Sequence, residues 1–293
     1  MADTKIGFIG AGKAGTSFGR YVAEKRPAGF SLSGYHSRTP ASAERAAALT
    51  GSRAFADAAS LIAASDLVVL SVPDGAVAAV AAATDGGAPA GRTGGQASLF
   101  CHLSGSLSLP GIGSIHPLAA LYDRETAWEK LATAWFSIEG EEAFLQAAHA
   151  LLDALGNPYC EIAKGKKPLY HAASAVASNL VCAVAYTAAE LYRACGLPED
   201  FSNNAWRPLF LENAKNIAAL GPSAALTGPL ERGDAATIAG HLEALAAAPP
   251  DIREAYVALS RVLVDTAREK HPDRDYAEIE ALLAACGPSR KEC

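Results

Sequence analysis

A glycine-rich turn near the start of the chain has the residue types that bind phosphate groups. It follows the apolar segment 5–9 in the pattern G-x-G-x-x-G, with the residues Gly10, Ala11, Gly12, Lys13, Ala14 and Gly15. The first glycine permits a tight bend, the second leaves room for a pyrophosphate, and the third lets the next helix pack closely. The helix N-terminus adds free N–H groups and partial positive charge. The pattern predicts a dinucleotide site, and a ligand-free strand–helix turn is the alternative.

The residues after the second expected strand, 30–36, indicate which dinucleotide would bind. An NAD site places an acidic residue there to bind the ribose 2′-hydroxyl. This chain has Ser37, Arg38 and Thr39 instead, and its first acid is Glu44. A guanidinium beside two hydroxyls suits a 2′-phosphate, which a carboxylate would repel. We therefore expect NADP, and a solvated surface arginine is the alternative for Arg38.

The apolar run 66–72 is expected to be a strand buried on both faces, and polar residues follow it. Ligands of such folds bind at the carboxyl ends of the strands. We expect Val72 and Pro73 to pack against the cofactor. Asp74 is expected to cap the helix that begins near Gly75.

Two histidines end later expected strands, His102 after 98–102 and His116 after 113–116. We expect His102 and Ser104 to contact the cofactor, and we interpret His116 as a proton donor or a substrate-carboxylate contact. Loop histidines bonded to the backbone are the alternative. No carboxylate or cysteine accompanies them at ligand spacing, so no catalytic metal is expected.

The segment 169–189 contains no Asp, Glu, Lys or Arg and carries further candidate catalytic residues. Positions 171 and 179 of one helix differ by about 80° beyond two full turns, so their side chains can border one cleft. We interpret His171 as the proton donor, Asn179 as a substrate-orienting amide and Ser178 as a substrate contact. A backbone-bonded histidine and a packing amide are the alternatives. Because the segment also holds His, Ser, Asn and Thr, we expect a helix buried inside the protein, and no membrane span.

A possible anion site lies later in the chain, where Thr227 and Gly228 precede Pro229. Threonine is a fair N-cap and proline suits a first helical turn, so a helix is expected to begin here. Its free N–H groups, with Arg232, could bind a substrate carboxylate. Plain capping, with the arginine paired to a neighbouring acid, is the alternative.

These residues must be positioned by two different kinds of domain. Strand-like segments recur at 5–9, 30–36, 53–55, 66–72, 98–102, 113–116, 134–138 and 159–162, with helices between several of them. After residue 163 the strand signals stop and helical segments follow at 169–194, 205–220, 229–248, 252–269 and 276–285. The basic run 164–168 is most simply a solvated linker, with Lys167 reaching the cleft as an alternative. We predict an α/β Rossmann domain with a doubly wound, mostly parallel sheet over residues 1–163, and an all-α domain over 164–293.

Composition limits the class of protein. Half of the 293 residues are apolar, and the net charge is −6, which argues against a dedicated nucleic-acid binder. The first residues show no charged segment followed by a long apolar one, as a secretory signal would. The cysteines form no C-x-x-C pair. We expect a cytoplasmic protein with free thiols.

Together these motifs resemble the superfamily of 6-phosphogluconate-dehydrogenase-type reductases, which includes ketopantoate reductase, pyrroline-5-carboxylate reductase and 3-hydroxyisobutyrate dehydrogenase. More narrowly, the segments 102–106, 113–118, 170–179 and 226–241 resemble Rossmann-like proteins with a DUF2520 domain. The resemblance implies an active site led by the long helix and a homodimer formed through the helical halves. Related ketoacid reductases carry a Lys four residues before an Asn on that helix, whereas Ala175 stands four residues before Asn179 here.

Three functional hypotheses follow. The first is an NADP-dependent oxidoreductase that reduces a small carboxylate-bearing ketone by hydride transfer, as ketopantoate reductase does. The second is an imine reductase of the pyrroline-5-carboxylate type, which needs less acid catalysis. The third is a non-catalytic NADP-binding sensor or assembly protein, which the missing lysine motivates.

Overall fold

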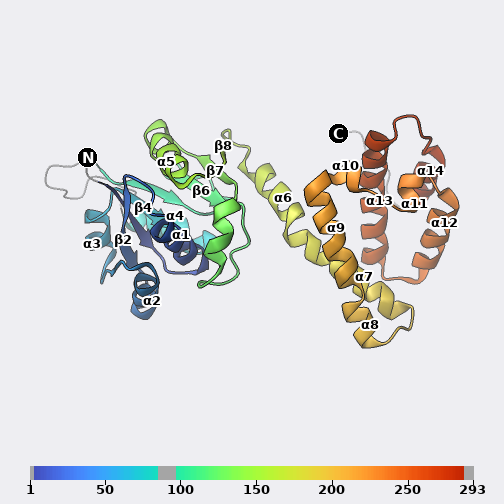
Figure 1. The fold of residues 1–293 in the computed structure, drawn as a ribbon, viewed down its shortest axis with the longest axis horizontal. Helices are drawn as coiled ribbons and strands as arrows, with labels where there is room; N and C mark the ends of the chain where they lie inside the picture. Colours follow the sequence, from blue (N-terminus) through green and yellow to red (C-terminus); the bar gives the residue numbers. More distant parts are fainter. Residues whose placement is uncertain (1–2, 85–96, 287–293) are drawn as a thin grey trace. The chain divides into compact units, whose positions relative to one another are not determined.

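The computed structural model describes residues 3–84 and 97–286. Their contacts divide the chain into two compact units, Met1–Ser178 and Asn179–Cys293. Figure 1 shows a sheet with helices in the first unit and helices alone in the second.

The first unit is built on an eight-stranded sheet with the order β3-β2-β1-β4-β5-β6-β7-β8. Its strands are β1 Thr4–Ile9, β2 Phe30–His36, β3 Arg53–Ala54, β4 Leu67–Leu70, β5 Leu99–His102, β6 Gly113–Pro117, β7 Phe136–Glu139 and β8 Tyr159–Glu161. The first six strands in that order are parallel, as in a doubly wound dinucleotide-binding fold. Strand β7 is antiparallel to β6, and β8 is parallel to β7. The predicted mostly parallel α/β sheet is confirmed.

Helices cover both faces of this sheet, because successive strand side chains point to opposite faces. Phe8 of β1 packs into a buried cluster with Phe18 of one helix and Leu151 of another, whereas Ile9 packs on the other face with Leu61 and Val77. The helices of the unit are α1 Lys13–Lys25, α2 Pro40–Thr50, α3 Ala58–Ala63, α4 Asp74–Ala83, α5 Glu142–Leu155 and α6 Lys167–Ala177, with the 3-10 helix η2 Ala127–Thr133.

The division between the units falls at Ser178, later than the expected boundary near residue 163. Helix α6 belongs to the first unit because its first residue, Lys167, is 1% exposed and bonds to Ser114 of β6. The basic run therefore does not act as a solvated linker at Lys167.

The second unit is entirely helical over its described residues, as predicted. Its core joins Leu230, Ile238, Val257, Val264 and Ile279. Its helices are α7 Asn179–Ala194, α8 Glu199–Asn204, α9 Trp206–Leu220, α10 Pro222–Ala225, α11 Pro229–Arg232, α12 Ala235–Ala244, α13 Pro250–Lys270 and α14 Ala277–Ala285, with the 3-10 helix η3 Leu245–Ala247.

Two of the expected helices are interrupted. The segment 229–248 divides after Arg232, because Gly233 adopts φ +77° and the Asp234 carboxylate then caps α12 by accepting from the N–H of Thr237 at 3.0 Å. The segment 169–194 divides at Ser178, whose φ of −129° and ψ of −77° are not helical. The N–H of Ser178 bonds to the carbonyl of Ala175 at 3.3 Å, which is an i→i−3 bond in place of the i→i−4 bond of an α-helix.

The expectation that 169–189 lies buried inside the protein is wrong for this chain. Only 6% of the most apolar window of Lys167–Ala194 is buried. Leu169 is 72% exposed, Val176 60% and Leu180 54%. By length and composition alone, Lys167–Ala194 could cross a membrane.

Candidate functional site

The glycine-rich turn lies between β1 and α1, at the carboxyl edge of the sheet. Gly10 has φ +108°, and a Cβ there would lie 2.4 Å from the carbonyl oxygen of Ser71. A Cβ on Gly15 would lie 2.2 Å from the Ser71 hydroxyl, but a Cβ on Gly12 would meet only one atom, at 3.9 Å. No side chain caps α1, which begins at Lys13. Two glycines are thus needed for packing, while the third faces space beside free helix N–H groups, which fits a pyrophosphate.

The residues after β2 leave a cation available beside this turn. Arg38 and Thr39 are exposed and Ser37 is half-buried. The Arg38 guanidinium forms no ion pair with any residue in the described ranges. The arrangement fits a 2′-phosphate.

Asp74 does not cap a helix, contrary to expectation. Helix α4 begins at Asp74 itself, and Pro73 occupies the N-cap without a side-chain hydrogen bond. The Asp74 carboxylate instead accepts from the hydroxyls of Ser104 at 2.7 Å and Ser106 at 3.1 Å. Those hydroxyls follow β5, so Asp74 ties the loop after β4 to the loop after β5.

One face of the sheet is polar across β5, β6 and β7. In the strand register His102 pairs with Ser114, Ser114 with Glu139, and His116 with Ser137, so these five side chains project from the same face. We call them the polar face. Earlier strands present apolar side chains on that side, including Leu70 and Phe100. Buried polar groups are costly unless they are satisfied or functional, so the polar face is a candidate site.

Helix α6 completes the polar face with two side chains. The Lys167 ammonium donates to the Ser114 hydroxyl and lies 3.4 Å from Oε2 of Glu139. The Tyr170 hydroxyl lies 2.7 Å from Nδ1 of His116. Burial lowers the pKa of Lys167, and the charge of Glu139 opposes that shift.

Both imidazoles of the polar face are held neutral. The pKa of His102 is lowered to about 4. Burial is the main cause, the charge of Lys167 acts in the same direction, and the charge of Asp74 acts against it. Burial also lowers the pKa of His116 to about 4, with His171 and Lys167 adding to the effect. At neutral pH each ring therefore carries one proton and can donate one hydrogen bond.

His102 is fully buried, and one of its ring nitrogens has a partner. Nδ1 accepts from the N–H of Ser104 at 3.2 Å, which assigns the proton to Nε2. Nε2 is buried and bonds to no atom of the described chain. An unpartnered buried donor at the end of β5 fits a polar group of a bound ligand.

Two predicted catalytic histidines come together at Gly105. The ring centroids of His116 and His171 are 6.4 Å apart. A Cβ on Gly105 would lie 2.8 Å from Nε2 of His116 and 2.9 Å from Cδ2 of His171. Glycine at this position therefore lets the loop after β5 approach both rings.

The other predicted substrate residues, apart from Ser178, belong to the second unit. Asn179 begins α7, and the helix break at Ser178 means that the 80° phase between residues 171 and 179 does not apply. Gly228, not Thr227, is the N-cap of α11, which has only four residues. Arg232 ends that helix, and its charge lowers the pKa of Asp234 together with the hydrogen bonds of Thr237. Their roles stay predictions.

The sequence motifs did not predict Tyr170 as a site residue, and they gave Lys167 only as an alternative to a solvated linker. The sequence feature that could have indicated Lys167 is its position. It precedes Pro168 at the start of a helix and stands four residues before His171. Residues three and four apart share a helix face. Within the described ranges, no three His, Cys, Asp or Glu side chains are grouped to hold a metal ion.

Comparison with protein families agrees with this architecture. Residues 5–92 match the family described as NADP oxidoreductase, coenzyme F420-dependent. Residues 134–263 match the domain of unknown function DUF2520. The two matches place a segment similar to NADP oxidoreductases before a segment similar to DUF2520 domains. The DUF2520 match begins with β7, so that segment contributes Ser137, Glu139, Lys167 and Tyr170 to the site.

Solved structures resemble this chain over most of its length. Protein TM1727 from Thermotoga maritima is 24% identical with a TM-score of 0.71, covering 90% of this chain and 99% of its own. A candidate NADP oxidoreductase, BF3122 from Bacteroides fragilis, is 26% identical with a TM-score of 0.64, covering 90% and 98%. A Plasmodium falciparum pyrroline carboxylate reductase with NADP bound is 13% identical with a TM-score of 0.51, covering 98% and 97%. No curated protein sequence matches. The chain has an NADP-binding, oxidoreductase-like fold.

Proposed function

We propose that this chain is an NADPH-dependent reductase of a small carboxylate-bearing ketone. The observation that carries the proposal is the polar face, where two neutral imidazoles at the carboxyl ends of β5 and β6 are accompanied by a buried lysine that contacts Ser114 and Glu139. Hydride transfer to a ketone creates negative charge on its oxygen, and hydrogen-bond donors with a nearby cation stabilise that charge. A purely structural role would not account for so many buried polar groups.

The cofactor would be held along the carboxyl edge of the sheet. The glycine turn, Gly10 to Gly15, would bind its phosphates, and Ser37, Arg38 and Thr39 its 2′-phosphate. Val72, Pro73, His102 and Ser104 would contact the nicotinamide end. When bound, NADPH supplies the hydride.

The residues of the polar face then orient and polarise the ketone. A neutral Tyr170, whose pKa burial raises, can donate to Nδ1 of His116, which leaves the ring proton on Nε2. Gly105 packs against this ring, because a Cβ there would lie 2.8 Å from Nε2. A substrate oxygen would accept the Nε2 hydrogen bond from the side of the ring that the loop does not cover. A neutral imidazole is a known means of polarising a carbonyl. His171 remains the proposed source of the final proton.

The charge of Lys167 favours a ketone over an imine as substrate. The charge of Lys167 changes the pKa of His116 more than the charge of Asp74 does. A protonated imine is a cation, so a net positive field at His116 would disfavour it. The same field stabilises a developing alkoxide. Asn179 remains the proposed orienting amide, and Ser178, Thr227, Gly228 and Arg232 the proposed contacts of the substrate carboxylate.

The proposal is tested by following NADPH consumption by the full-length chain. We expect turnover of ketopantoate with NADPH, and weaker turnover with NADH because Arg38 has no 2′-phosphate to bind. Preference for pyrroline-5-carboxylate would replace the ketone with the imine hypothesis. Binding of NADPH without turnover of either substrate or of a panel of keto acids would favour the sensor hypothesis.

We also propose that two copies associate through the second unit. Helix α9 buries none of its residues, and Leu209, Leu211 and Leu220 on it are each more than half exposed. Leu180 and Tyr186 of α7 are also more than half exposed. A second copy offers the same apolar surface, so pairing removes both from water.

A further inference from the structure

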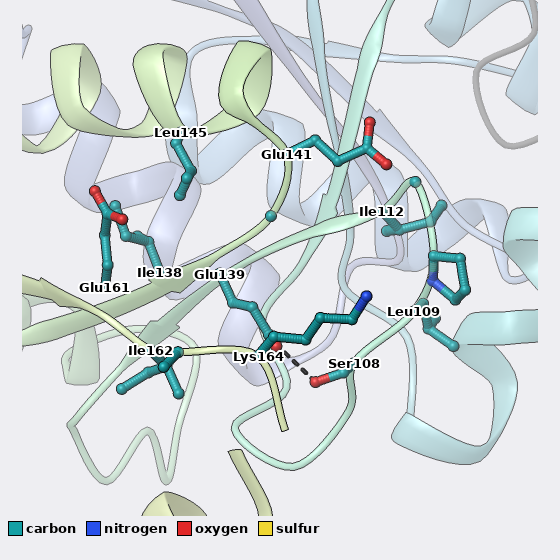
Figure 2. Close-up of a pocket in the computed structure, with 14 residues that line it drawn as sticks. Ser108, Leu109, Ile112, Ile138, Glu139, Glu141, Leu145, Glu161, Ile162 and Lys164 are labelled. Atoms are coloured by element: carbon teal, nitrogen blue, oxygen red, sulfur yellow. Dashed lines mark hydrogen bonds between the residues drawn. The ribbon is translucent and has the colours of Figure 1, made fainter. Parts of the chain in front are cut away.

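A separate cavity lies beside β6, β7 and β8, several strands along the sheet from the glycine turn after β1. Its volume is about 570 Å³. Three segments line it: 108–112 before β6, 138–141 with Leu145 at the end of β7, and 161–164 after β8 (Figure 2). Because β7 and β8 run opposite to β6, their carboxyl ends lie beside the amino end of β6. His116, where we place the reduction, lies toward the carboxyl end of β6, whereas this cavity lies beside the amino end of β6. The cavity is therefore a second site that shares Glu139 with the polar face.

The lining combines apolar walls with excess negative charge. Its apolar side chains are Leu109, Ile112, Ile138, Leu145 and Ile162. Three carboxylates, from Glu139, Glu141 and Glu161, line it together with one ammonium, from Lys164. The Lys167 ammonium also lies 3.4 Å from Glu139, and Nε2 of His149 lies 2.8 Å from Glu161, so the carboxylates still outnumber the two ammonium groups. In Figure 2 Glu141 and Glu161 lie on opposite sides of the view, with Glu139 and Lys164 between them. Such a lining selects a cation with an aliphatic body over an anion.

Glu139 connects this cavity to the polar face. Its Oε2 accepts from the Ser108 hydroxyl at 2.7 Å and lies 3.4 Å from the Lys167 ammonium, and its side chain is 15% exposed. An ammonium ion in the cavity would therefore share a carboxylate with Lys167. Because Lys167 acts on the pKa of His102 and His116, occupancy of the cavity changes the charge balance at the reducing centre.

We propose that this cavity binds a small primary ammonium ion with an aliphatic chain, and that Glu139 is shared between that ligand and Lys167. The site would act as an effector site for the polar face. The binding claim stands on the cavity, its lining and the Glu139 contacts, and does not depend on the reductase activity. A failed binding test therefore leaves the proposed reaction untouched.

The test uses the full-length chain and n-butylammonium as the probe, with butanoate as a matched anion of similar length. Titration is followed by backbone amide NMR shifts. We expect saturable shifts confined to residues 108–112, 138–141 and 161–164 with n-butylammonium, and none there with butanoate. Glu161→Gln and Glu141→Gln should each weaken binding about three- to fivefold, as for one partly exposed ion pair.

Glu142→Gln is the matched control, because Glu142 adjoins the cavity on α5 but does not line it. It should leave the dissociation constant within about twofold, since a screened surface charge contributes little. Glu139→Gln should abolish saturation, and the Glu161 and Glu141 variants keep the test valid should that chain not fold. Three results would overturn the proposal: equal chemical-shift changes with butanoate, no saturation with n-butylammonium, or a dissociation constant that none of the three Glu→Gln variants changes.

Discussion

A lysine ammonium that is almost fully buried needs a reason, because burial of a charge costs several kcal/mol unless it is paired. Lys167 has Ser114 and Glu139 as partners. It also faces the imidazoles of His102 and His116, whose pKa values it lowers. Lys167 therefore adds to the effect of burial in keeping both imidazoles neutral, and it helps to hold α6 on the sheet.

Lys167→Met should lower the free energy of unfolding by about 3 kcal/mol, because it leaves Glu139 without its cation. The pKa of His116 should rise at the same time. Urea unfolding measures the first effect and an NMR titration of the His116 ring measures the second. The double variant Lys167→Met, Glu139→Gln should recover part of the stability, and an unchanged His116 pKa in both would contradict the assigned role.

The buried histidines also predict an acid-sensitive fold. The pKa of His102 is lowered from 6.5 to about 4 in the folded chain, so the unfolded chain binds more protons between these values. The free energy of unfolding should therefore fall as the pH is lowered through this window, by roughly 3 kcal/mol for a full shift of this size. His102→Gln should lose less stability over the same window in urea unfolding. An identical loss in both proteins would be evidence against the lowered pKa.

Sequence reasoning located His102, His116 and His171, because each stands at the end of an expected strand or in an expected helix. It gave Lys167 only as an alternative to a solvated linker, because three nearby lysines look alike until the register of β6 and β7 brings Ser114 and Glu139 close to one of them. It assigned Asp74 to a cap for a similar reason. The hydroxyls that Asp74 binds in place of a helix N-terminus belong to Ser104 and Ser106. These residues follow β5, which is close to Asp74 in space but not in sequence.

At the scale of elements, two glycines of the turn between β1 and α1 have different roles. Gly15 is needed for packing, whereas Gly12 leaves space for the ligand. Gly12 has φ −78°, which alanine tolerates, and a Cβ there would meet only one atom. Gly12→Ala should therefore leave the melting temperature nearly unchanged and weaken NADPH binding severalfold. Gly15→Ala should lower stability by about 1–3 kcal/mol, since its Cβ would overlap the Ser71 hydroxyl. Thermal unfolding and fluorescence titration compare the pair, and equal stability loss in both would refute the distinction.

The strands were predictable because their apolar runs are short and bounded by polar residues. Helix α5 was missed although Phe144, Ala148, Leu151, Leu152 and Leu155 recur at helical spacing and are all buried. The break at Ser178 was missed for a physical reason. A single polar residue in an alanine-rich stretch leaves the apolar periodicity intact, so the pattern continues where the backbone does not.

At the scale of the molecule, the exposed apolar residues of the second unit predict a dimer in solution. Leu209→Glu should shift the chain from dimer to monomer, since α9 has no buried residue whose packing the change could disturb. Ala219→Glu places the same charge ten residues along, about 80° around the helix from both Leu209 and Leu211, and should leave the dimer intact. Light scattering after size exclusion gives the masses. A wild-type monomer would remove the proposed association.

The account depends on the polar face being the place where substrate is reduced. The direct measurement is kcat/KM for NADPH-dependent reduction of ketopantoate by the wild type and by His116→Gln, with the Kd for NADPH measured in parallel. We predict that kcat/KM falls about a hundredfold or more, as for loss of a group that acts on the reacting atoms, while the Kd stays within about twofold. Unchanged kcat/KM in the variant would contradict the assignment of the reducing centre to the polar face.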